Sequence, residues 1–485
     1  MTPFIRELRL NDPLRAYAAL EHLPYSLLLD SADQNHPNAR YSFVVSHPIE
    51  TIESKNGRIT LTNWEEQREL RGRDIFEFIQ ERVRHWVPQT QTVRGLPPFQ
   101  GGAAGLFGYD LAREIEKLPN KGQNNPDMPD LAIGIYDQVL AFDHEKQQSW
   151  IITHAKNYHD ARKKQDYILG MISEPVDIDL FTGVDLKWKR NFTESDYKQQ
   201  IQKTIDYIKA GDIFQANISQ RFDAKLPKDF DAFAHYLRLR KINPAPFSAF
   251  MNCGNELKIS SASPERFLTV KDRMVETKPI KGTRPRNQDP EIDERNRCAL
   301  QASIKDNAEN TMIVDLLRND LSKNCLSNSV RVTELCKVES FASVHHLVST
   351  IRGTLKKDAS ALNLLKDCFP GGSITGAPKI RAMEIIEEIE PSHRGPYCGS
   401  IAYIGFDGNM DSSILIRTLV FDKNSVSLQA GGGITAESDP EEEYQETLHK
   451  ARALIASFKP NRTVLNTDVN KVGSNAIHTE NIMTA

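Results

Sequence analysis

Two pairs of acidic residues are spaced so that they could bind a cation. Asp306 and Glu309 lie three residues apart in the segment KDNAENTMIVDLLRND, and Glu443 and Glu446 repeat that spacing near the C-terminus. Residues separated by three positions share one face of a helix. Magnesium prefers carboxylate oxygens together with water and a substrate oxygen. A solvated surface, with Glu446 in an ordinary ion pair to Lys450, is the alternative. The residues alone leave both interpretations open.

A lysine and a glycine-rich loop could supply further chemistry. Lys281 lies in the segment Pro279–Thr283, and a neutral lysine amine can attack carbon to form a covalent intermediate. An exposed lysine in a turn is the alternative. The loop Gly371–Lys379 is not a phosphate-binding motif, because Ala377 stands where that motif requires lysine. Free amides at the start of the following helix would suit a carboxylate, and an ordinary turn into a helix is equally compatible.

The N-terminal part of the chain is predicted to be mostly antiparallel sheet. Between about residues 24 and 155, short apolar runs such as YSFVV and LAIGIYDQVLAFD alternate with turn-forming clusters. The segment 101–108 has glycines, but their spacing does not fit a dinucleotide-binding fingerprint. We expect these glycines to serve close packing within a sheet.

The second half is richer in long helices. Thr193 is a plausible helix cap before a stripe of apolar residues that ends at Gly211. Longer helices are predicted from Pro290 to Ser322, from Pro378 and from Pro440, since proline is favoured at the first helical position. Helices and strands mix without a regular repeat, so the fold class is α+β. The predicted parts are an N-terminal region (1–172), a linker (173–192), a catalytic region (193–460) and a disordered tail (461–485).

Composition excludes several classes of function. The 485 residues exceed one typical domain. The 61 basic and 65 acidic residues form no long block of like charge, so we expect no nucleic-acid partner and no membrane partner. The six cysteines form no C-x-x-C pair and are predicted to be reduced thiols. The N-terminus lacks the pattern of a signal peptide, and no apolar run approaches roughly 18 residues. A cytoplasmic location is therefore expected.

Several short motifs occur together in one order along the chain. They are Ser263–Phe267, Pro279–Thr283, Asp306–Asn310, Val314–Asp320, His346–Ser349, Gly371–Lys379 and Tyr444–Glu446. In this order they resemble the chorismate-utilising enzymes, over nearly all of residues 195–457. Leu28–Ser31 and Phe99–Asp110 extend the resemblance into the N-terminal half. The resemblance implies a fold like that of anthranilate synthase component I, with large antiparallel sheets packed as a sandwich and helices on the outer faces.

Within that family, the residue at position 281 discriminates between reactions. At this segment, anthranilate synthase large subunits have a sequence similar to Pro-Ile-Ala-Gly-Thr, whereas aminodeoxychorismate synthases carry lysine in place of the alanine. This chain has Lys281 at that position. The resemblance therefore implies amination of chorismate at C4 through a covalent Lys281 intermediate, on the route to 4-aminobenzoate and folate. Glu265 would be the acid that protonates the departing C4 hydroxyl.

The resemblance also implies the remaining site residues. A magnesium ion (Mg2+) would be held by Glu309 and Glu446, with Asp306 and Glu443 acting through water. Substrate contacts are expected at Thr283, His346, Thr375, Tyr397, Arg417, Gly431, Gly433 and Lys450. A site for bound tryptophan is expected at Ser31, Asn38, Ala39, Arg40, Tyr41, Phe247, Ser248 and Ala249. Asp30 replaces the glutamate of the family's Leu-Leu-Glu-Ser motif, which argues against inhibition by tryptophan and leaves a structural role open.

The nitrogen source is expected to be a separate subunit. The sequence has no Gly-x-Cys-x-Gly segment of a glutamine-hydrolysing enzyme, so ammonia would come from a glutamine amidotransferase partner in a heterodimer. Three alternatives remain. Anthranilate synthase component I is opposed chiefly by Lys281. An isochorismate or salicylate synthase would use water in place of ammonia. A catalytically inactive, ligand-binding relative would have no need of Glu265, Lys281 and the acidic pairs.

Overall fold

Two large antiparallel sheets form the centre of the protein. The computed structural model describes residues 2–88, 90–122, 128–174, 176, 181–341 and 344–460. The predicted tail (461–485) and residues 175 and 177–180 of the predicted linker lie outside this range. Within it, the strands form two sheets of 12 strands each. Alternating apolar runs therefore produced antiparallel sheet, as the sequence predicted.

The first sheet combines strands from both ends of the chain. In spatial order they are β1 (Phe4–Glu7), β10 (Gln148–Thr153), β9 (Gln138–Asp143), β3 (Tyr41–Val45), β2 (Leu27–Asp30), β13 (Phe247–Asn252), β14 (Leu257–Ser263), β23 (Thr418–Asp422), β24 (Ser425–Ile434), β12 (Gln215–Lys225) and β11 (Lys189–Arg190). The short β20 (Gly376–Ala377) pairs with the start of β12. The junction of the two halves is the pairing of β2 with β13.

The second sheet is mixed in the same way. In spatial order its strands are β17 (Ile280–Pro285), β19 (Val344–Thr354), β16 (Met274–Thr277), β15 (Arg266–Lys271), β22 (Met410–Ile414), β21 (Ser400–Gly405), β7 (Gly102–Phe107), β8 (Leu131–Tyr136), β4 (Glu50–Lys55), β5 (Arg58–Asn63) and β6 (Gln67–Arg71). β18 (Arg331–Ser340) pairs with β19 outside this path. Strands from the predicted N-terminal and catalytic regions thus share both sheets.

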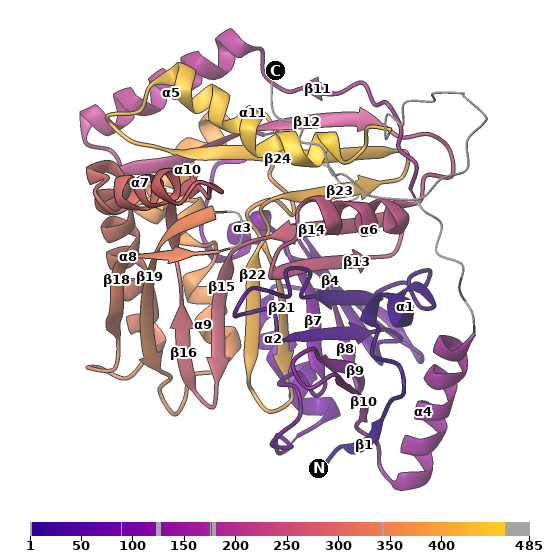
Figure 1. Cartoon of the computed structure of the whole chain (residues 1–485). Coiled ribbons are helices and arrows are strands. Elements are labelled where there is room, and N and C mark those ends of the chain that lie inside the picture. The colour runs from indigo at the N-terminus through magenta and orange to yellow at the C-terminus, as the bar shows by residue number, and fades with distance from the viewer. Residues whose placement is uncertain are drawn as a thin grey trace, which may run out of the picture.

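Helices cover the outer faces of the two sheets (Figure 1). They are α1 (Pro13–Ala18), α2 (Ile75–Trp86), α3 (Ala112–Ile115), α4 (Tyr158–Ser173), α5 (Glu194–Ala210), α6 (Ala232–Ile242), α7 (Pro290–Gln301), α8 (Ile304–Asn324), α9 (Ala361–Cys368), α10 (Lys379–Ile389) and α11 (Pro440–Ala456), with 3-10 turns η1 (Tyr109–Leu111) and η2 (Gly372–Ile374). No helix in the described ranges is long and apolar enough to cross a membrane.

Apolar side chains fill three layers. Phe43 of the first sheet and Tyr403 of the second belong to a core cluster between the sheets. A second cluster joins the outer face of the second sheet to α2, α8 and α9, and a third joins the first sheet to α1, α4, α6 and α11. Burial of apolar area on both sides of each sheet is the main source of stability in such a fold. The predicted sandwich with helices outside is confirmed.

The helix predictions were mostly right. Thr193 caps α5 by accepting a hydrogen bond from the backbone amide of Asp196, and Gly211 ends the helix in the left-handed conformation. α11 begins at Pro440, and α10 begins directly after Pro378. The single helix predicted from Pro290 to Ser322 was wrong, because the chain forms two helices there. Ser303 interrupts it, since its side chain caps the new helix α8.

The glycines of the segment 101–108 serve packing, as expected. β7 lies between β21 and β8. A side chain at Gly102 would come within 2.1 Å of the carbonyl oxygen of Ile404, and one at Gly105 within 2.3 Å of that of Ala132. The neighbouring strands leave no room for a Cβ atom. The six cysteines are all free, in agreement with the expected thiols.

Candidate active site

Lys281 lies at a junction of three elements. It is on β17, next to a register shift in the pairing of β17 with β19. Its Nζ atom is 3.1 Å from the carbonyl oxygen of Ser373, which belongs to η2, and 3.4 Å from Oε1 of Glu309 on α8. Gly282 has a left-handed φ of 75°, and a Cβ there would lie 2.8 Å from Cγ of Asp306. Glycine at this position therefore lets α8 approach the reactive segment.

Glu265 is connected to Lys281 through Ser373. The hydroxyl of Ser373 donates to Oε1 of Glu265 at 2.9 Å, while the carbonyl of the same residue faces Lys281. Burial raises the pKa of Glu265 to about 7, and the Ser373 hydrogen bond and the Lys281 charge offset this only in part. A carboxyl group with this pKa carries a proton in a substantial fraction of molecules at neutral pH. It is suited to general acid chemistry.

The glycine run of β24 makes room for the predicted metal carboxylates. A side chain at Gly432 would come within 2.8 Å of Oε2 of Glu443 and 3.5 Å of Oε1 of Glu446. One at Gly433 would come within 2.5 Å of Oε1 of Glu309. Carboxylates from α8 and α11 thus reach adjacent glycines. Without the glycines, the acidic side chains would be displaced.

Each predicted metal carboxylate has a basic partner in this structure. The pairs are Lys281–Glu309 (3.4 Å), Lys450–Glu446 (2.5 Å), Lys305–Glu443 (3.7 Å) and Arg284–Asp306 (3.2 Å). Burial and the charge of Glu446 raise the pKa of Glu443, despite a hydrogen bond from Ser438. For Glu446, burial acts in the same direction, but the charge of Lys450 and its hydrogen bond prevail and lower the pKa. Each of these carboxylates offers oxygen atoms, which are the ligands that a hard divalent cation prefers. The chemistry of the four side chains therefore suits such a cation.

Several predicted substrate contacts are gathered beside these groups. The Thr283 hydroxyl and Nδ1 of His346 are hydrogen bonded at 2.9 Å. Nζ of Lys450 donates to the carbonyl of Gly431 at 2.8 Å, and Arg417 donates to the carbonyl of Lys450 at 2.5 Å. Burial lowers the pKa of His346 to about 4, so the ring is neutral at neutral pH. Hydrogen-bond donors and acceptors from β17, β19, β24 and α11 therefore lie beside Lys281 and the acidic side chains.

Two other predicted substrate contacts, Thr375 and Tyr397, are buried and interact with neighbouring parts of the protein. Thr375 is fully buried, and its hydroxyl donates to the carbonyl of Gly371 at 2.8 Å. This bond closes the loop that carries Ser373. Tyr397 is buried, and burial raises its pKa well above the usual value. Its ring lies 5.7 Å from the guanidinium of Arg394.

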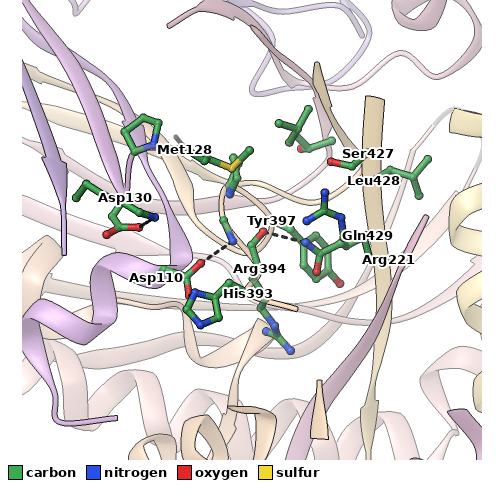
Figure 2. A pocket seen from close by; sticks show the side chains of 16 residues that line it. Asp110, Met128, Asp130, Arg221, His393, Arg394, Tyr397, Ser427, Leu428 and Gln429 are labelled. Carbon is green, nitrogen blue, oxygen red and sulfur yellow. Dashed lines mark hydrogen bonds and ion pairs between the residues drawn. The ribbon is translucent and has the colours of Figure 1, made fainter. Parts of the chain in front are cut away.

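Tyr397 also lines a polar pocket (Figure 2). Asp110 and His393 line another part of its wall. In the described parts of the chain, Asp110, His393 and Glu387 are the group of potential metal-binding side chains whose donor atoms lie within 4.8 Å of one another, and no three of the carboxylates predicted to bind magnesium meet that spacing in this structure. Arg113 contacts both carboxylates, and the backbone amide of Gly395 donates to Asp110 at 2.7 Å. Because Arg113 already pairs with both carboxylates, we interpret the group as an ion-pair cluster.

A second cavity collects most of the residues predicted to bind tryptophan. Its lining includes Ser31, Asn38, Tyr41, Phe247, Ser248 and Ala249, and its empty space is about 600 Å³. Arg40 instead forms ion pairs with Asp143 at 2.9 Å and Glu145 at 2.6 Å, and Ala39 is buried. Asp30 accepts hydrogen bonds from Tyr236 and Arg240 of α6, both at 2.8 Å. Asp30, which replaces the glutamate of the family motif, is therefore already hydrogen bonded within the protein.

Two residues of the site were missed by sequence reasoning. Gln215, at the start of β12, donates its side-chain amide to Oε1 of Glu309. Arg394 is buried and donates to the carbonyls of Ile374 at 3.1 Å and Asn217 at 2.6 Å, while it pairs with Glu390. Arg394 thus ties the loop of Ser373 to β12. Both Glu390 and Arg394 lie beyond the end of α10, so no helical pattern in the sequence signalled this pair.

Comparisons with known proteins agree with this arrangement. The profile of the family described as chorismate binding enzyme matches residues 25–456. The chain is 41% identical over 443 residues to aminodeoxychorismate synthase component 1 of Escherichia coli (strain K12), which covers 91% of this chain and 95% of that protein. It is 37% identical over 453 residues to anthranilate synthase component 1 of Thermus thermophilus, which covers 93% of this chain and 96% of that protein.

A solved structure supports the same relationship. The crystal structure of anthranilate synthase component I from Streptococcus pneumoniae superposes with a TM-score of 0.76 at 33% sequence identity, covering 87% of this chain and 93% of that chain. The expected fold is therefore confirmed by a solved relative as well as by the arrangement of the sheets. The profile match extends from the N-terminal strands to α11, so it includes every residue discussed around Lys281. The chain belongs to the family of chorismate-binding enzymes.

Proposed function

We propose that this protein aminates chorismate at C4 to form 4-amino-4-deoxychorismate, with Lys281 as the nucleophile. The observation that carries the proposal is the position of the Lys281 amine, 3.1 Å from the Ser373 carbonyl, with the Ser373 hydroxyl bound to Glu265. The alanine of the anthranilate synthase motif offers no such nucleophile. The similarity to aminodeoxychorismate synthase component 1 from Escherichia coli supports the same reaction.

The proposed reaction consists of two allylic displacements. In the first, neutral Lys281 bonds to C2 of the ring, the double bonds shift, and the C4 oxygen leaves as water after it takes a proton from Glu265. In the second, ammonia bonds to C4, the double bonds shift back, and the bond between C2 and Lys281 breaks, with its electron pair returning to the lysine nitrogen. The extra proton on the new C4 nitrogen then passes to the Glu265 carboxylate, which restores the acid. Proton transfer by a positioned group such as Glu265 contributes roughly 10²- to 10⁴-fold to rate.

We propose that a magnesium ion is held by Glu309 and Glu446, with Asp306 and Glu443 acting through water. When bound, the ion would neutralise the ring carboxylate of the substrate and fix its orientation. Glu309 now contacts Lys281, and Glu446 contacts Lys450. Lys450 supplies positive charge to Glu446 in this structure, and Gly432 and Gly433 leave space beside the carboxylates. Arg417, at the same end of the site, is suited to a carboxylate of the substrate.

We propose a separate glutamine amidotransferase subunit as the source of ammonia. The name component 1 of the relatives implies a second component of those enzymes. The second cavity is proposed to hold tryptophan in a structural role. Tyr41 and Phe247 offer aromatic surface to an indole ring, and Arg266 with Asp411 offers charge to an amino acid backbone. The cytoplasmic location stays a prediction.

Covalent trapping tests the role of Lys281. The protein is incubated with chorismate and magnesium, without ammonia, and its intact mass is measured. An increase equal to chorismate less water is expected, and Lys281→Ala is expected to abolish it and to impair formation of the 4-amino product. Lys278→Ala is the matched control, because Lys278 lies in the same segment but pairs with Glu339 at 3.5 Å. An unchanged rate of amination in Lys281→Ala would refute the proposal.

A further inference from the structure

Three rings in contact, one pair stacked and the other tilted, connect the N-terminal half to the proposed active site. His36, in the connection between β2 and β3, stacks on Phe341 with a centroid distance of 4.5 Å and an interplanar angle of 13°. Phe341 also contacts His346 on β19, and the centroids of these two rings are 5.6 Å apart. We propose that His36 is a positioning residue for chorismate binding, because it holds His346 in place through Phe341. This inference rests on the proposed function of the site.

His36 is itself held in one orientation. The backbone amide of Asn38 donates to Nδ1 of His36 at 3.1 Å, and the backbone amide of His36 donates to the carbonyl of Asp33 at 2.9 Å. Because Nδ1 accepts a hydrogen bond, the ring proton is on Nε2. Burial lowers the pKa of His36 to about 4, and the charges of Arg266 and Lys278 act in the same direction while that of Asp33 opposes them. A neutral ring can stack flat on Phe341 at neutral pH.

Phe341 is fixed at the end of the hairpin formed by β18 and β19. Its backbone amide donates to the carbonyl of Val344 at 2.8 Å, and its carbonyl accepts from Arg286 at 2.9 Å. With its backbone held, the side chain can transmit the position of His36 to His346. Aromatic pairs of this kind contribute about 0.5–1.5 kcal/mol beyond the area they bury.

The last contact reaches the reactive segment. His346 is hydrogen bonded to Thr283 at 2.9 Å, and Thr283 follows Lys281 by two residues on β17. Both His346 and Thr283 are proposed substrate contacts, whereas the reactive amine is anchored separately by Ser373 and Glu309. Loss of His36 should therefore weaken the binding of chorismate more than it slows the chemical step.

Steady-state kinetics of chorismate consumption test this role. His36→Ala is expected to raise KM for chorismate about 3- to 10-fold, as loss of one aromatic contact implies, and to change kcat less than about 2-fold. His36→Phe keeps a flat ring on Phe341 and is expected to keep KM within about 2-fold of the original value. His47→Ala is the matched control, since His47 meets Tyr167 edge to face at 5.3 Å away from these residues, and no change in KM is expected.

A further variant keeps the test informative if His36→Ala does not fold. Phe341→Leu removes the ring between the two histidines and is expected to reproduce the rise in KM. Thermal unfolding is measured for every variant. A lower melting temperature with an unchanged KM in His36→Ala or Phe341→Leu would overturn the positioning role. Because consumption of chorismate is followed whatever the product, failure of this inference is distinguishable from failure of the proposed amination at C4.

Discussion

Burial raises the pKa of the Glu265 carboxyl group, whereas its hydrogen bond from Ser373 lowers it. Burial has the larger effect and raises the pKa to about 7. Proposed catalysis needs the protonated form, so its fraction falls as pH rises through this value. We therefore expect kcat to decrease above about pH 7, when the concentration of uncharged ammonia is held constant across the series. Activity that is flat or rising between pH 7 and 9 would contradict the assignment.

Substitution of the same residue tests its role independently. Glu265→Gln keeps the shape of the side chain but cannot supply a proton, so kcat is expected to fall by roughly 10²- to 10⁴-fold. The alkaline limb of the pH profile should disappear with it. Glu114→Gln provides a control, because burial also raises the pKa of Glu114, which is bound to Ser54 far from Lys281 in the sequence. A pH profile unchanged in Glu265→Gln would assign the ionisation to another group.

The sequence motifs predict Lys281, Glu265 and the acidic pairs as site residues, because each of them is defined by its immediate neighbours. They could not identify the carbonyl of Ser373 on Lys281, since a backbone contact depends on how the loop folds. Gln215 was missed for a related reason. It reaches Glu309 only because β12 ends beside α8, and no local pattern encodes that distance between elements.

Among the elements, β24 has the most direct consequence for the proposed magnesium site. In Gly433→Ala, the added Cβ would lie 2.5 Å from Oε1 of Glu309 and closer still to Gln215. Displacement of the carboxylate should weaken apparent magnesium affinity on the order of 10- to 100-fold, as loss of supporting contacts does in other metal sites. The rate is titrated with magnesium, and chelation is expected to abolish it. Gly170→Ala on α4 is the control, because nothing lies within 4 Å of its added atom.

The break between α7 and α8 illustrates the limit of helical patterns. Residues 290–322 contain no glycine and no internal proline, so a continuous helix was the natural prediction. The side chain of Ser303 competes with helical bonding and accepts from the amide of Asp306 at 3.2 Å, which starts α8. Ser303→Ala is expected to lower stability by about 1 kcal/mol. Chemical denaturation measures this, and a difference below about 0.3 kcal/mol would show that the cap contributes little.

At the scale of the whole molecule, the two halves of the chain cannot be separated into independent sheets. β2 pairs with β13, and β7 pairs with β21. Such pairings between distant segments were beyond sequence patterns, which reveal strands but not their partners. A fragment of residues 193–460 would expose the edges of β13 and β21. We expect it to lack a cooperative thermal transition, as judged by near-ultraviolet circular dichroism. A sharp transition in the fragment would show that the catalytic region folds alone.

The position of the new nitrogen is the central claim, and identification of the product tests it most directly. The full chain is supplied with chorismate, magnesium and ammonia, and the products are separated and identified by mass and nuclear magnetic resonance. We predict 4-amino-4-deoxychorismate, with the enolpyruvyl group retained. Accumulation of anthranilate together with pyruvate would contradict the account, because nitrogen would then have entered at C2, where Lys281 is proposed to attack.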